Sequence, residues 1–541
     1  MRRFKSSEIF PRLAAVIKTG MLSAQSISLF VGLSILSATL PGAAQDAICF
    51  VSLKPGLLAT PKDGRLFVIL SVTNEPEPRL ALGRPGSKGP QAFAMDVRGF
   101  ASGTTQTVKH SSFGYPAHSM DDFFAQAGRS NEAGRAFTIQ ALFDCNPDLR
   151  VRNAPGNAFS KPQRVTVENL KNGSLRIELG EQVPEETLPP DKGQLRFVKL
   201  RSKLLTEFYD RPIYLRAGLV LPRDFEQEKE RRYPLWVRIG GLNTRYSSVV
   251  HLMDEHSDFK KVWMGDDTPR FVLLQVDGAG PLGDPYQINS ANSGPYGDAI
   301  TRELIPAIEQ QFRCVGKPEA RVLSGVSTGG WVCLALQIFY PDYFNGAWAS
   351  CPDPVDFRSF EVVNIYKDTN AYVNAHGNER PSERDLKGDT ILTMRQELGV
   401  EQLLGAGNDY ALSGEQWGEW TATFSPRGTD GRPAPLWDGG TGQISASVAG
   451  AWKKYDLRMV LEGNWKTLAP MLRGKIHIAS GEADQYFLNN AVHLLDDFLT
   501  KADPPAEAHI AYGPGKGHGW SNLSTKGMLE EMNGRVTGAV K

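Results

Sequence analysis

The chain has 541 residues and no formal net charge, because 60 lysines and arginines balance 60 aspartates and glutamates. Hydrophobic residues make up 41% of the chain and charged residues 22%, which are ordinary fractions for a globular protein and exclude disorder along its whole length. The neutral balance argues against nucleic acid as a partner, since such binding draws on a basic surface. Five cysteines without a C-x-x-C pair exclude a small disulfide scaffold and a zinc or dithiol motif.

Residues 1–44 have the pattern of a secretory signal peptide. A basic start that includes Arg2 and Arg3 precedes an apolar stretch over 27–40, and small residues follow up to the expected cleavage point before Gln45. The apolar stretch is shorter than the roughly 20 residues that a membrane-spanning helix needs. We therefore expect a secreted or periplasmic protein without stable membrane insertion after cleavage. An uncleaved anchor is the alternative.

Export exposes a protein to conditions in which disulfides form. Cys49 and Cys145 both lie in the N-terminal part of the chain, so a bond between them is one pairing that the sequence allows. Spacing alone does not decide which cysteines pair. With five cysteines in the chain, at least one thiol is expected to be unpaired.

Residues 45–180 predict an all-β, sandwich-like module. The segment 65–72 is apolar enough for a buried strand. The segments 164–168 and 174–179 alternate at period two on either side of Asn172-Gly173, which predicts two strands joined by a turn.

A Pro- and Glu-rich stretch over 181–194 is the predicted linker to the rest of the chain. Beyond it, apolar strand candidates alternate with amphipathic helices. The segment 297–312, for example, places one apolar face on a helix, formed by Ile300, Leu304, Ile305, Ile308 and Phe312. This alternation predicts an α/β fold over 195–541, with a mostly parallel sheet covered by helices on both faces.

The five residues Gly325–Gly329 form a G-x-S-x-G motif between a predicted strand over 320–324 and a predicted helix over 331–340. A sharp turn in this context strains the serine and presents its hydroxyl at a helix N-terminus, where N–H groups favour negative charge. Glycines two residues on either side let strand and helix pack closely. Ser327 is therefore the candidate nucleophile, and an ordinary glycine-rich turn is the alternative.

A nucleophilic serine needs a basic histidine, and in α/β-hydrolases this histidine comes last in the chain. His518 lies in a glycine-rich loop after the last predicted strand, from which it can reach back over the sheet. His477 and His509 lie inside predicted strands and His493 inside a predicted helix, where structural roles suffice. His518 is therefore the candidate base.

The acid that orients this histidine is expected in the loop after the strand 476–480, where Asp484 is the first choice and Glu482 the alternative. The gap of 518 − 484 = 34 residues fits one helix and one strand. The longer gap between Ser327 and the acid predicts an insertion over about 352–473. This insertion is rich in tryptophan, whose rings either contact the substrate or form the insertion's own core.

An oxyanion hole needs two backbone N–H donors. One is expected from Thr328, directly after the nucleophile, and the other from Gly241 or Leu242, in the loop after the strand 235–239. The pair Gly240-Gly241 is equally compatible with an ordinary turn.

Three residues are candidates for substrate binding. Asn289 and Asn292 lie in a polar loop that leads into the helix starting near 297, where they either bind substrate hydroxyls or, as Asn292 and Ser293 allow, cap the helix. Trp520 lies two residues after the candidate base. We predict no metal site, because the sequence has neither an H-E-x-x-H motif nor clustered aspartates.

The segments around Ser327, over Gly481–Asp484 and over Gly517–Trp520 resemble the putative-esterase family of α/β-hydrolases. That family contains esterase D, feruloyl and acetyl-xylan esterases, the mycolyltransferases and enterochelin esterase. The resemblance covers about 195–350 and 470–525.

This resemblance implies an eight-stranded, mostly parallel sheet, no cofactor, and an N-terminal β module as in enterochelin esterase. It assigns Ser327 as nucleophile, Asp484 as acid and His518 as base, with Gly241 and Thr328 around the oxyanion. One departure is that the histidine usual before the oxyanion glycines is absent, since Arg238-Ile239 precede Gly240.

Together these features predict an exported serine carboxylic-ester hydrolase that acts through an acyl-enzyme on a small-molecule or glycan-linked ester. An acyltransferase of the mycolyltransferase kind is one alternative, if the pocket admits an alcohol and excludes water. A non-catalytic protein that binds a glycan or partner on a hydrolase fold is the other. The complete set of Ser327, Asp484 and His518 in the expected order argues against this last alternative.

Overall fold

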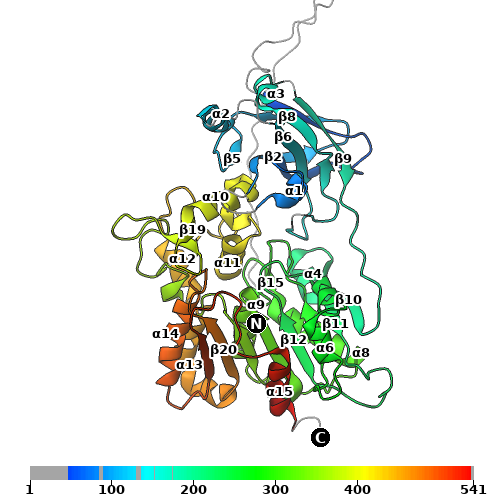
Figure 1. Cartoon of the computed structure of the whole chain (residues 1–541), viewed down its shortest axis with the longest axis vertical. Coiled ribbons are helices and arrows are strands. Elements are labelled where there is room, and N and C mark those ends of the chain that lie inside the picture. The colour runs from blue at the N-terminus through cyan, green and yellow to red at the C-terminus, as the bar shows by residue number, and fades with distance from the viewer. Residues whose placement is uncertain (1–46, 84–88, 130–135, 152, 174, 538–541) are drawn as a thin grey trace, which may run out of the picture. The chain divides into compact units, whose positions relative to one another are not determined.

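The N-terminal part of the chain forms a nine-stranded sheet (Figure 1). The computed structural model describes residues 47–83, 89–129, 136–151, 153–173 and 175–537, so the predicted signal peptide lies outside the described residues. The strand order is β4-β1-β9-β7-β6-β2-β3-β5, with β8 paired to β6. The strands are β1 Ala47–Leu53, β2 Lys62–Ser71, β3 Gln91–Phe100, β4 Thr105–Lys109, β5 Phe113–Tyr115, β6 Ala136–Asp144, β7 Ala158–Ser160, β8 Gln163–Thr166 and β9 Leu175–Gln182, and the helices are α1 Pro78–Ala81, α2 Met120–Arg129 and α3 Val167–Lys171.

Strand β2 is buried on both faces, which explains its continuous apolar sequence. Leu66, Val68 and Leu70 lie in the core of the N-terminal module. Phe67 and Ile69 point the other way and pack with Val400, Leu403 and Leu404 of helix α10 (Met394–Leu404). The predicted buried strand is thus confirmed, and its second face supports a helix more than 300 residues later in the chain.

The turn predicted at Asn172-Gly173 does not join two neighbouring strands. β8 ends at Thr166 and pairs with β6, whereas β9 pairs with β1 and β7. Helix α3 lies between them and starts with a capping box, in which the side chains of Thr166 and Asn169 each accept a hydrogen bond from the other residue's backbone N–H. The period-two pattern was therefore misleading here, because two satisfied N–H groups favour a helical turn.

The C-terminal part contains a second sheet of eight strands in the order β10-β11-β13-β12-β16-β17-β20-β21. β11 is antiparallel to both of its neighbours, and every further pair from β13 to β21 is parallel. This confirms the predicted α/β-hydrolase fold with a mostly parallel, eight-stranded sheet. The strands are β10 Leu195–Ser202, β11 Ile213–Val220, β12 Leu235–Ile239, β13 Val272–Val276, β16 Arg321–Val326, β17 Ala347–Ser350, β20 Ile476–Gly481 and β21 His509–Gly513.

Helices cover both faces of this sheet (Figure 1). Val237 and Leu274 on one face pack in a core with α8, α9, α13 and α14, whereas Trp236 and Leu273 on the other pack with α6 and α15. The apolar face predicted over 297–312 is buried along its whole length. The helices are α4 Lys203–Tyr209, α5 Val249–Leu252, α6 Asp258–Trp263, α7 Tyr296–Ala299, α8 Ile305–Gln311, α9 Thr328–Phe339, α14 Asn489–Thr500 and α15 Thr525–Val536, with a π-helical segment Ile300–Leu304 between α7 and α8.

The predicted insertion follows β17 and returns to the sheet at β20. Trp417, Trp437 and Trp452 are fully buried, and the rings of Trp417 and Trp437 lie 4.4 Å apart between centroids. These tryptophans belong to the same core as one face of the sheet, so their role is packing. The elements are β18 Pro381–Arg384, β19 Thr390–Thr393, α10, α11 Gln416–Phe424, α12 Ala446–Trp452 and α13 Leu457–Leu472.

The chain passes from the first sheet to the second between Gln182 and Leu195, across the predicted linker. Glu186 in this segment forms ion pairs with Arg216 at 3.2 Å and with Arg245 at 2.8 Å, which fix it to the second part. The described residues from 47 onward form one compact unit. The division into two domains stays a prediction.

The disulfide considered between Cys49 and Cys145 is not formed, and all five cysteines are free thiols. Cys49 lies on β1 and Cys145 directly follows β6, and two strands separate β1 from β6 in the sheet. Three strand spacings amount to about 14 Å. Two cysteines whose Cα atoms lie more than about 7 Å apart do not form a disulfide.

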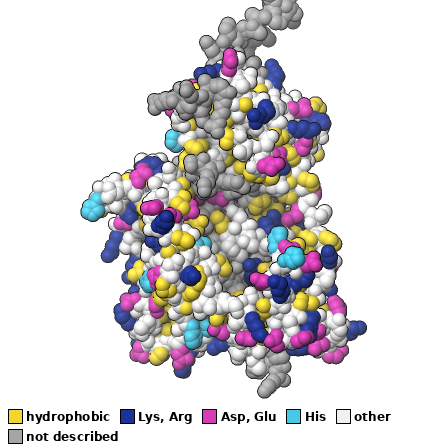
Figure 2. Space-filling model, viewed as in Figure 1, with side chains coloured by type: hydrophobic (Ala, Val, Ile, Leu, Met, Phe, Trp, Pro, Cys, Tyr) yellow, Lys and Arg dark blue, Asp and Glu magenta, His cyan; other side chains and the backbone are white. Residues whose placement is uncertain are grey.

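Charged side chains of both signs are mixed on the face of the molecule drawn in Figure 2, in keeping with the zero net charge. None of the helices within the described ranges combines the length and the apolar character needed to cross a membrane.

Substitution of Arg65 tests how much the contact between β2 and the insertion contributes to stability. Its guanidinium is 2% exposed and donates to the Leu403 carbonyl at 2.8 Å, to Asp96 at 2.7 Å and to Asn408 at 2.7 Å. Arg65→Met keeps an aliphatic side chain but leaves these acceptors without their donor. We expect the free energy of unfolding, measured by urea denaturation, to fall by about 2–4 kcal/mol.

Arg98→Met is the matched control, because Arg98 is exposed on the neighbouring strand β3. Its expected effect on the free energy of unfolding is below about 0.5 kcal/mol. Equal effects of the two substitutions would contradict a structural role for the Arg65 contacts.

Candidate active site

Ser327 lies at a sharp turn between strand β16 and helix α9. Its backbone has φ 59° and ψ −126°, a conformation that a residue with a side chain rarely adopts. The surrounding chain holds it there, since its N–H donates to the Ser350 carbonyl at 3.0 Å and its carbonyl accepts from Gly330 and Trp331 at 2.8 and 3.1 Å. The predicted strand, strained turn and helix are thus confirmed.

The two motif glycines are required by close packing. A Cβ atom added at Gly325 would lie 1.9 Å from the Gly329 carbonyl oxygen, and one added at Gly329 would lie 2.3 Å from the Ile239 carbonyl oxygen. Neither position has room for a side chain. The start of α9 therefore lies directly against the ends of β12 and β16.

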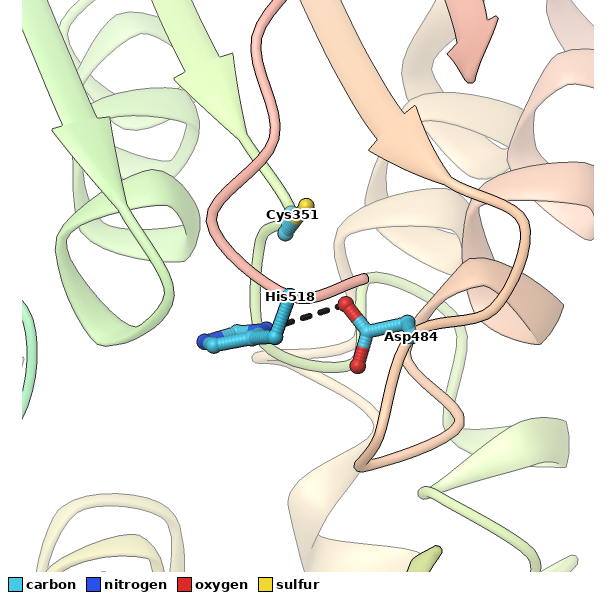
Figure 3. A group of neighbouring side chains, drawn as sticks. All are labelled: Cys351, Asp484 and His518. Atoms are coloured by element: carbon cyan, nitrogen blue, oxygen red, sulfur yellow. Dashed lines mark hydrogen bonds and ion pairs between the residues drawn. The ribbon is translucent and has the colours of Figure 1, made fainter. Parts of the chain in front are cut away.

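Asp484 and His518 form a hydrogen-bonded pair, with His518 Nδ1 and Asp484 Oδ2 2.9 Å apart (Figure 3). Asp484 follows β20 and is fully buried, and its other oxygen accepts from the Tyr486 N–H at 2.9 Å. The backbone N–H of His518 donates to the Gln485 side chain at 2.6 Å, which holds the loop after β21 against the loop after β20. With Nδ1 occupied by Asp484, Nε2 is the nitrogen left for a reacting group.

The alternative acid, Glu482, pairs with another histidine. Its carboxylate lies 3.2 Å from His493 Nε2, and both side chains are partly exposed. Of these two pairs, only the Asp484–His518 pair has a fully buried carboxylate, since the Glu482 side chain is 34% exposed.

Ser327 and His518 line the same cavity of about 300 Å³, together with Leu242. Ser327 and Asp484 are 157 residues apart in the sequence, and strands β16 and β20 bring them to the same edge of the sheet. This is the edge at which the carboxyl ends of the parallel strands meet, where open α/β sheets bind ligands.

The predicted oxyanion donors also lie beside Ser327. Thr328 is the first residue of α9, so its N–H has no partner within the helix. A Cβ atom added at Gly241 would be 3.6 Å from Ser327 Cβ, and Leu242 lines the cavity. Thr328 and the loop 241–242 therefore approach the serine from two sides.

Asp353 is a residue near the nucleophile that the sequence did not indicate. The Ser327 hydroxyl donates to Asp353 Oδ1 at 3.4 Å. The other oxygen accepts from Tyr286 at 2.6 Å, Thr328 at 3.1 Å and Trp420 at 3.2 Å. Its position three residues after β17, at the same sheet edge as Ser327, was the available signal, but it was assigned to the insertion.

The pKa of His518 is shifted by opposing effects. Burial lowers it, whereas the hydrogen bond and charge of Asp484, with a further contribution from the charge of Asp353, outweigh burial and hold the pKa of His518 above its usual range. The imidazole is therefore more basic than a free histidine, which suits a group that must accept a proton.

Within the described residues, the one group of three side chains with metal-ligand spacing is Cys351, Asp484 and His518 (Figure 3). Burial raises the pKa of the Cys351 thiol to about 11, so that it is protonated at neutral pH, whereas a metal binds the thiolate. The Asp484–His518 hydrogen bond already uses Nδ1 of the imidazole. This chemistry fits an acid–base pair better than a metal centre.

Asn289, Asn292 and Trp520 do not line the cavity. The Asn289 side chain accepts from the Asp298 N–H at 3.0 Å, so Asn289, and not Asn292 or Ser293, caps the start of α7. The Asn292 side chain donates to the carbonyls of Ala422 at 3.0 Å and Ser425 at 2.9 Å. Their predicted contact with substrate stays a prediction without support from this geometry.

Trp520 lies over Gly513 at the end of β21, where an added Cβ atom would be 2.7 Å from the indole ring. Its carbonyl accepts from the Cys351 thiol at 3.6 Å. These contacts position the loop that carries His518, and the predicted substrate contact of Trp520 likewise stays a prediction.

Comparison with known proteins agrees with the resemblance of the motifs. The family model described as putative esterase matches residues 282–518, a segment that contains Ser327, Asp484 and His518. This match confirms the resemblance over residues 282–518. No curated protein matches the chain.

Solved structures of similar proteins include a ferulic acid esterase, at 13% identity over 64% of this chain and 99% of that one, with a TM-score of 0.38. The fluorophosphonate-binding serine hydrolase FphF of Staphylococcus aureus is 12% identical over 65% and 100%, with a TM-score of 0.35. An S-formylglutathione hydrolase from Agrobacterium tumefaciens is 12% identical over 65% and 96%, with a TM-score of 0.34. No functional conclusion rests on likenesses of this size.

The Asp484–His518 pair predicts a defined pH dependence for the reaction of Ser327 with a fluorophosphonate. Only the neutral imidazole accepts a proton, so the labelling rate is expected to rise with pH through the raised pKa of His518. Asp484→Asn removes the charge that raises this pKa. The inflection is then expected at lower pH, with a plateau rate reduced at least about 100-fold.

Glu482→Gln is the matched control, since Glu482 pairs with His493 outside the cavity. It is expected to change neither the inflection nor the plateau. A wild-type profile in the Asp484→Asn protein would contradict the assignment of the acid.

Proposed function

We propose that this protein is an exported serine esterase that hydrolyses small-molecule esters through an acyl-enzyme on Ser327. The observation that carries the proposal is the hydrogen-bonded Asp484–His518 pair in contact with the cavity that Ser327 lines. The esterase family match over the same segment gives independent support. The cavity of about 300 Å³ fits a small ester group.

In the first half of the reaction, His518 Nε2 accepts the proton of Ser327 as Oγ forms a bond to the ester carbonyl carbon. Asp484 orients the imidazole and stabilises its protonated form. The N–H groups of Thr328 and of Gly241 or Leu242 stabilise the oxyanion, and one such donor is typically worth about 3–4 kcal/mol. The tetrahedral intermediate then breaks its bond to the alcohol, which leaves with the proton from His518.

In the second half, His518 accepts a proton from water as the water oxygen attacks the acyl-enzyme carbonyl. A second tetrahedral intermediate collapses, and Ser327 leaves with the proton returned by His518. The products are the carboxylic acid and the free enzyme. If an alcohol enters in place of water, the same steps yield a new ester, which is the acyltransferase alternative.

The Ser327 hydroxyl must turn for this reaction to begin. In the structure it donates to Asp353 at 3.4 Å, which is a long hydrogen bond. Rotation about the Cα–Cβ bond redirects the hydroxyl at the cost of that weak contact. Catalytic hydrogen bonds in proteins without substrate are often long, so this geometry is compatible with the proposed role.

The proposal predicts that a fluorophosphonate labels the wild-type protein on Ser327, as found by peptide mapping, and that Ser327→Ala abolishes labelling. Hydrolysis of short aryl esters is expected to fall by at least about 10³-fold in Ser327→Ala and in His518→Ala. His493→Ala is the matched control and is expected to keep wild-type activity, since His493 does not line the cavity. A folded wild-type protein without label would exclude the proposed nucleophile and favour the non-catalytic alternative.

Product analysis separates hydrolysis from acyl transfer. We expect free acid as the main product from small aryl esters, and the same assay on a glycan-linked ester tests the other substrate class that the sequence allows. A new ester that forms only with an added alcohol would favour the acyltransferase.

The export proposal predicts that the mature protein begins at Gln45. It rests on the basic start, the apolar stretch 27–40 and the small residues before Gln45. The measurement is N-terminal sequencing of protein recovered from the periplasm or the medium of a bacterial host that expresses the full chain. Protein that keeps residues 1–44 and stays with the membrane fraction would instead indicate an uncleaved anchor.

A further inference from the structure

The ionisable side chains that line the cavity beside Ser327 are acidic, with the exception of His518. Six carboxyl side chains line it, and its lining contains neither lysine nor arginine. His518 is the one lining residue that can carry positive charge. The carboxyl groups belong to Asp353, Glu361, Glu383, Glu397, Glu401 and Glu415.

Two of these carboxyl groups have structural roles. Asp353 accepts from Tyr286 and Thr328, as described above. Glu401 accepts from the backbone N–H groups of Trp417 at 2.9 Å and Gly418 at 2.8 Å. These N–H groups lie in the first turn of α11 and therefore have no partner within the helix. These hydrogen bonds account for the burial of both groups.

Glu361 is not accounted for in this way. Its side chain is 2% exposed, and its Oε2 atom has no hydrogen-bond partner. No ion pair involves Glu361 in the part of the chain that the structure describes. A buried carboxyl oxygen without a hydrogen-bond partner is costly to maintain, so the place of Glu361 in the cavity wall calls for an explanation.

Glu397 lies close enough to Glu361 to affect its ionisation. Burial raises the pKa of Glu361 well above its usual range, and the charge of Glu397 is the next largest cause. Glu397 accepts from Ser382 and from the Trp417 indole at 3.2 Å, both through Oε2. A positive charge placed between the two groups would stabilise the ionised form of each.

The remaining lining favours an organic cation over a metal ion. Among the described residues, no three of these carboxyl groups converge with metal-ligand spacing. Apolar and aromatic side chains complete the wall, namely Leu392, Val400, Trp420, Tyr486 and Leu488. Such a mixture suits an alkylammonium group, whose charge meets a carboxylate while its carbon atoms contact apolar surface.

We propose that Glu361, assisted by Glu397, binds a protonated amine carried by the ester on which Ser327 acts. The ammonium N–H groups donate to the unpartnered Oε2 atom of Glu361, and the attached carbon chain lies along the apolar wall. The proposal rests on the proposed esterase function for the identity of the reaction. Binding of the cation, however, does not depend on catalysis and can be measured without it.

The test is calorimetric titration of the full chain carrying Ser327→Ala, which retains the cavity but not the nucleophile. Two ester pairs are compared at pH 7, where the amine is mainly protonated. Leucine ethyl ester and ethyl 4-methylpentanoate differ by an ammonium group on the acyl side. 2-(Dimethylamino)ethyl acetate and 3-methylbutyl acetate differ by a protonated nitrogen on the alcohol side.

In at least one pair the cationic ester is expected to bind about 10- to 100-fold more tightly than its neutral counterpart. Adding Glu361→Gln is expected to reduce this ratio to below about threefold without weakening the neutral ester. Glu397→Gln is expected to reduce it less. Glu255→Gln, which removes an exposed carboxylate outside the cavity, is the matched control and is expected to leave the ratio unchanged.

Thermal unfolding of the same proteins separates binding from folding. Glu361→Gln keeps the shape of the side chain and removes a buried carboxyl group that no donor or cation stabilises, so its Tm at pH 7 is expected to be equal or higher. A lower Tm together with weaker binding of both the cationic and the neutral ester would indicate a structural role and overturn the proposal.

Three other outcomes would also overturn it. These are equal binding of the two members of both pairs, failure of both cationic esters to bind, and an unchanged ratio in Glu361→Gln. Calcium binding that is lost in Glu361→Gln would assign the site to a metal ion instead. The esterase proposal can fail independently of the cation site. In that case a fluorophosphonate does not label the wild-type protein, but the Ser327→Ala protein still binds the cationic esters more tightly than the neutral ones.

Discussion

The strained backbone at Ser327 is the constraint on which the rest of the site depends. A side chain at φ 59° is retained only where the surrounding structure leaves no alternative, and here β12, β16 and β17 supply that surrounding. The two motif glycines let α9 start in direct contact with the ends of these strands, so the serine cannot relax without separating the helix from the sheet. The Cβ atom of Ser327 therefore has one location, and every other group of the site has to reach the hydroxyl that it carries. Asp484 and His518 do so from the loops after β20 and β21, which end at the same edge.

The insertion reaches Ser327 from outside the sheet, and the N-terminal module supports it. Helix α10 presents Glu397, Val400 and Glu401 to the cavity, while Val400, Leu403 and Leu404 pack against Phe67 and Ile69 of β2. One helix thus shares its residues between the wall of the cavity and the contact with the first sheet. A shift of β2 would be passed to the carboxyl groups beside Ser327 through this packing, because packed cores do not deform gradually. This gives the module a physical connection to the cavity wall even though its strands supply no member of the Ser327, Asp484 and His518 set.

Features that depend on neighbouring residues in the sequence could be predicted, whereas features that depend on contacts between distant residues could not. Ser327 was predictable because its strand, turn and helix are consecutive, and Asp484 and His518 followed because each lies directly after a strand that could be recognised. The helix between Thr166 and Asn172 was missed because two capping hydrogen bonds outweighed an alternating pattern. Asp353 lies near a recognisable strand end but within the predicted insertion, and Glu361 gave no local signal. Their importance arises from contacts with Ser327, Tyr286 and α10, which are set by how the insertion packs on the sheet. The absent Cys49–Cys145 bond has the same origin, since the strand order places the two cysteines far apart.

The charge of the cavity acts on the two charges of the proposed reaction in opposite ways. Asp484 and Asp353 favour the imidazolium that forms when His518 accepts a proton, as the raised pKa of His518 already reflects. The same carboxylates disfavour the oxyanion, whose stabilisation then depends on the short-range N–H donors of Thr328 and the loop 241–242. A substrate that brings a positive charge to Glu361 would remove part of this opposition at the moment of binding. The proposed cation site and the proposed triad therefore form one electrostatic arrangement, in which the substrate neutralises the field that would otherwise oppose its own reaction.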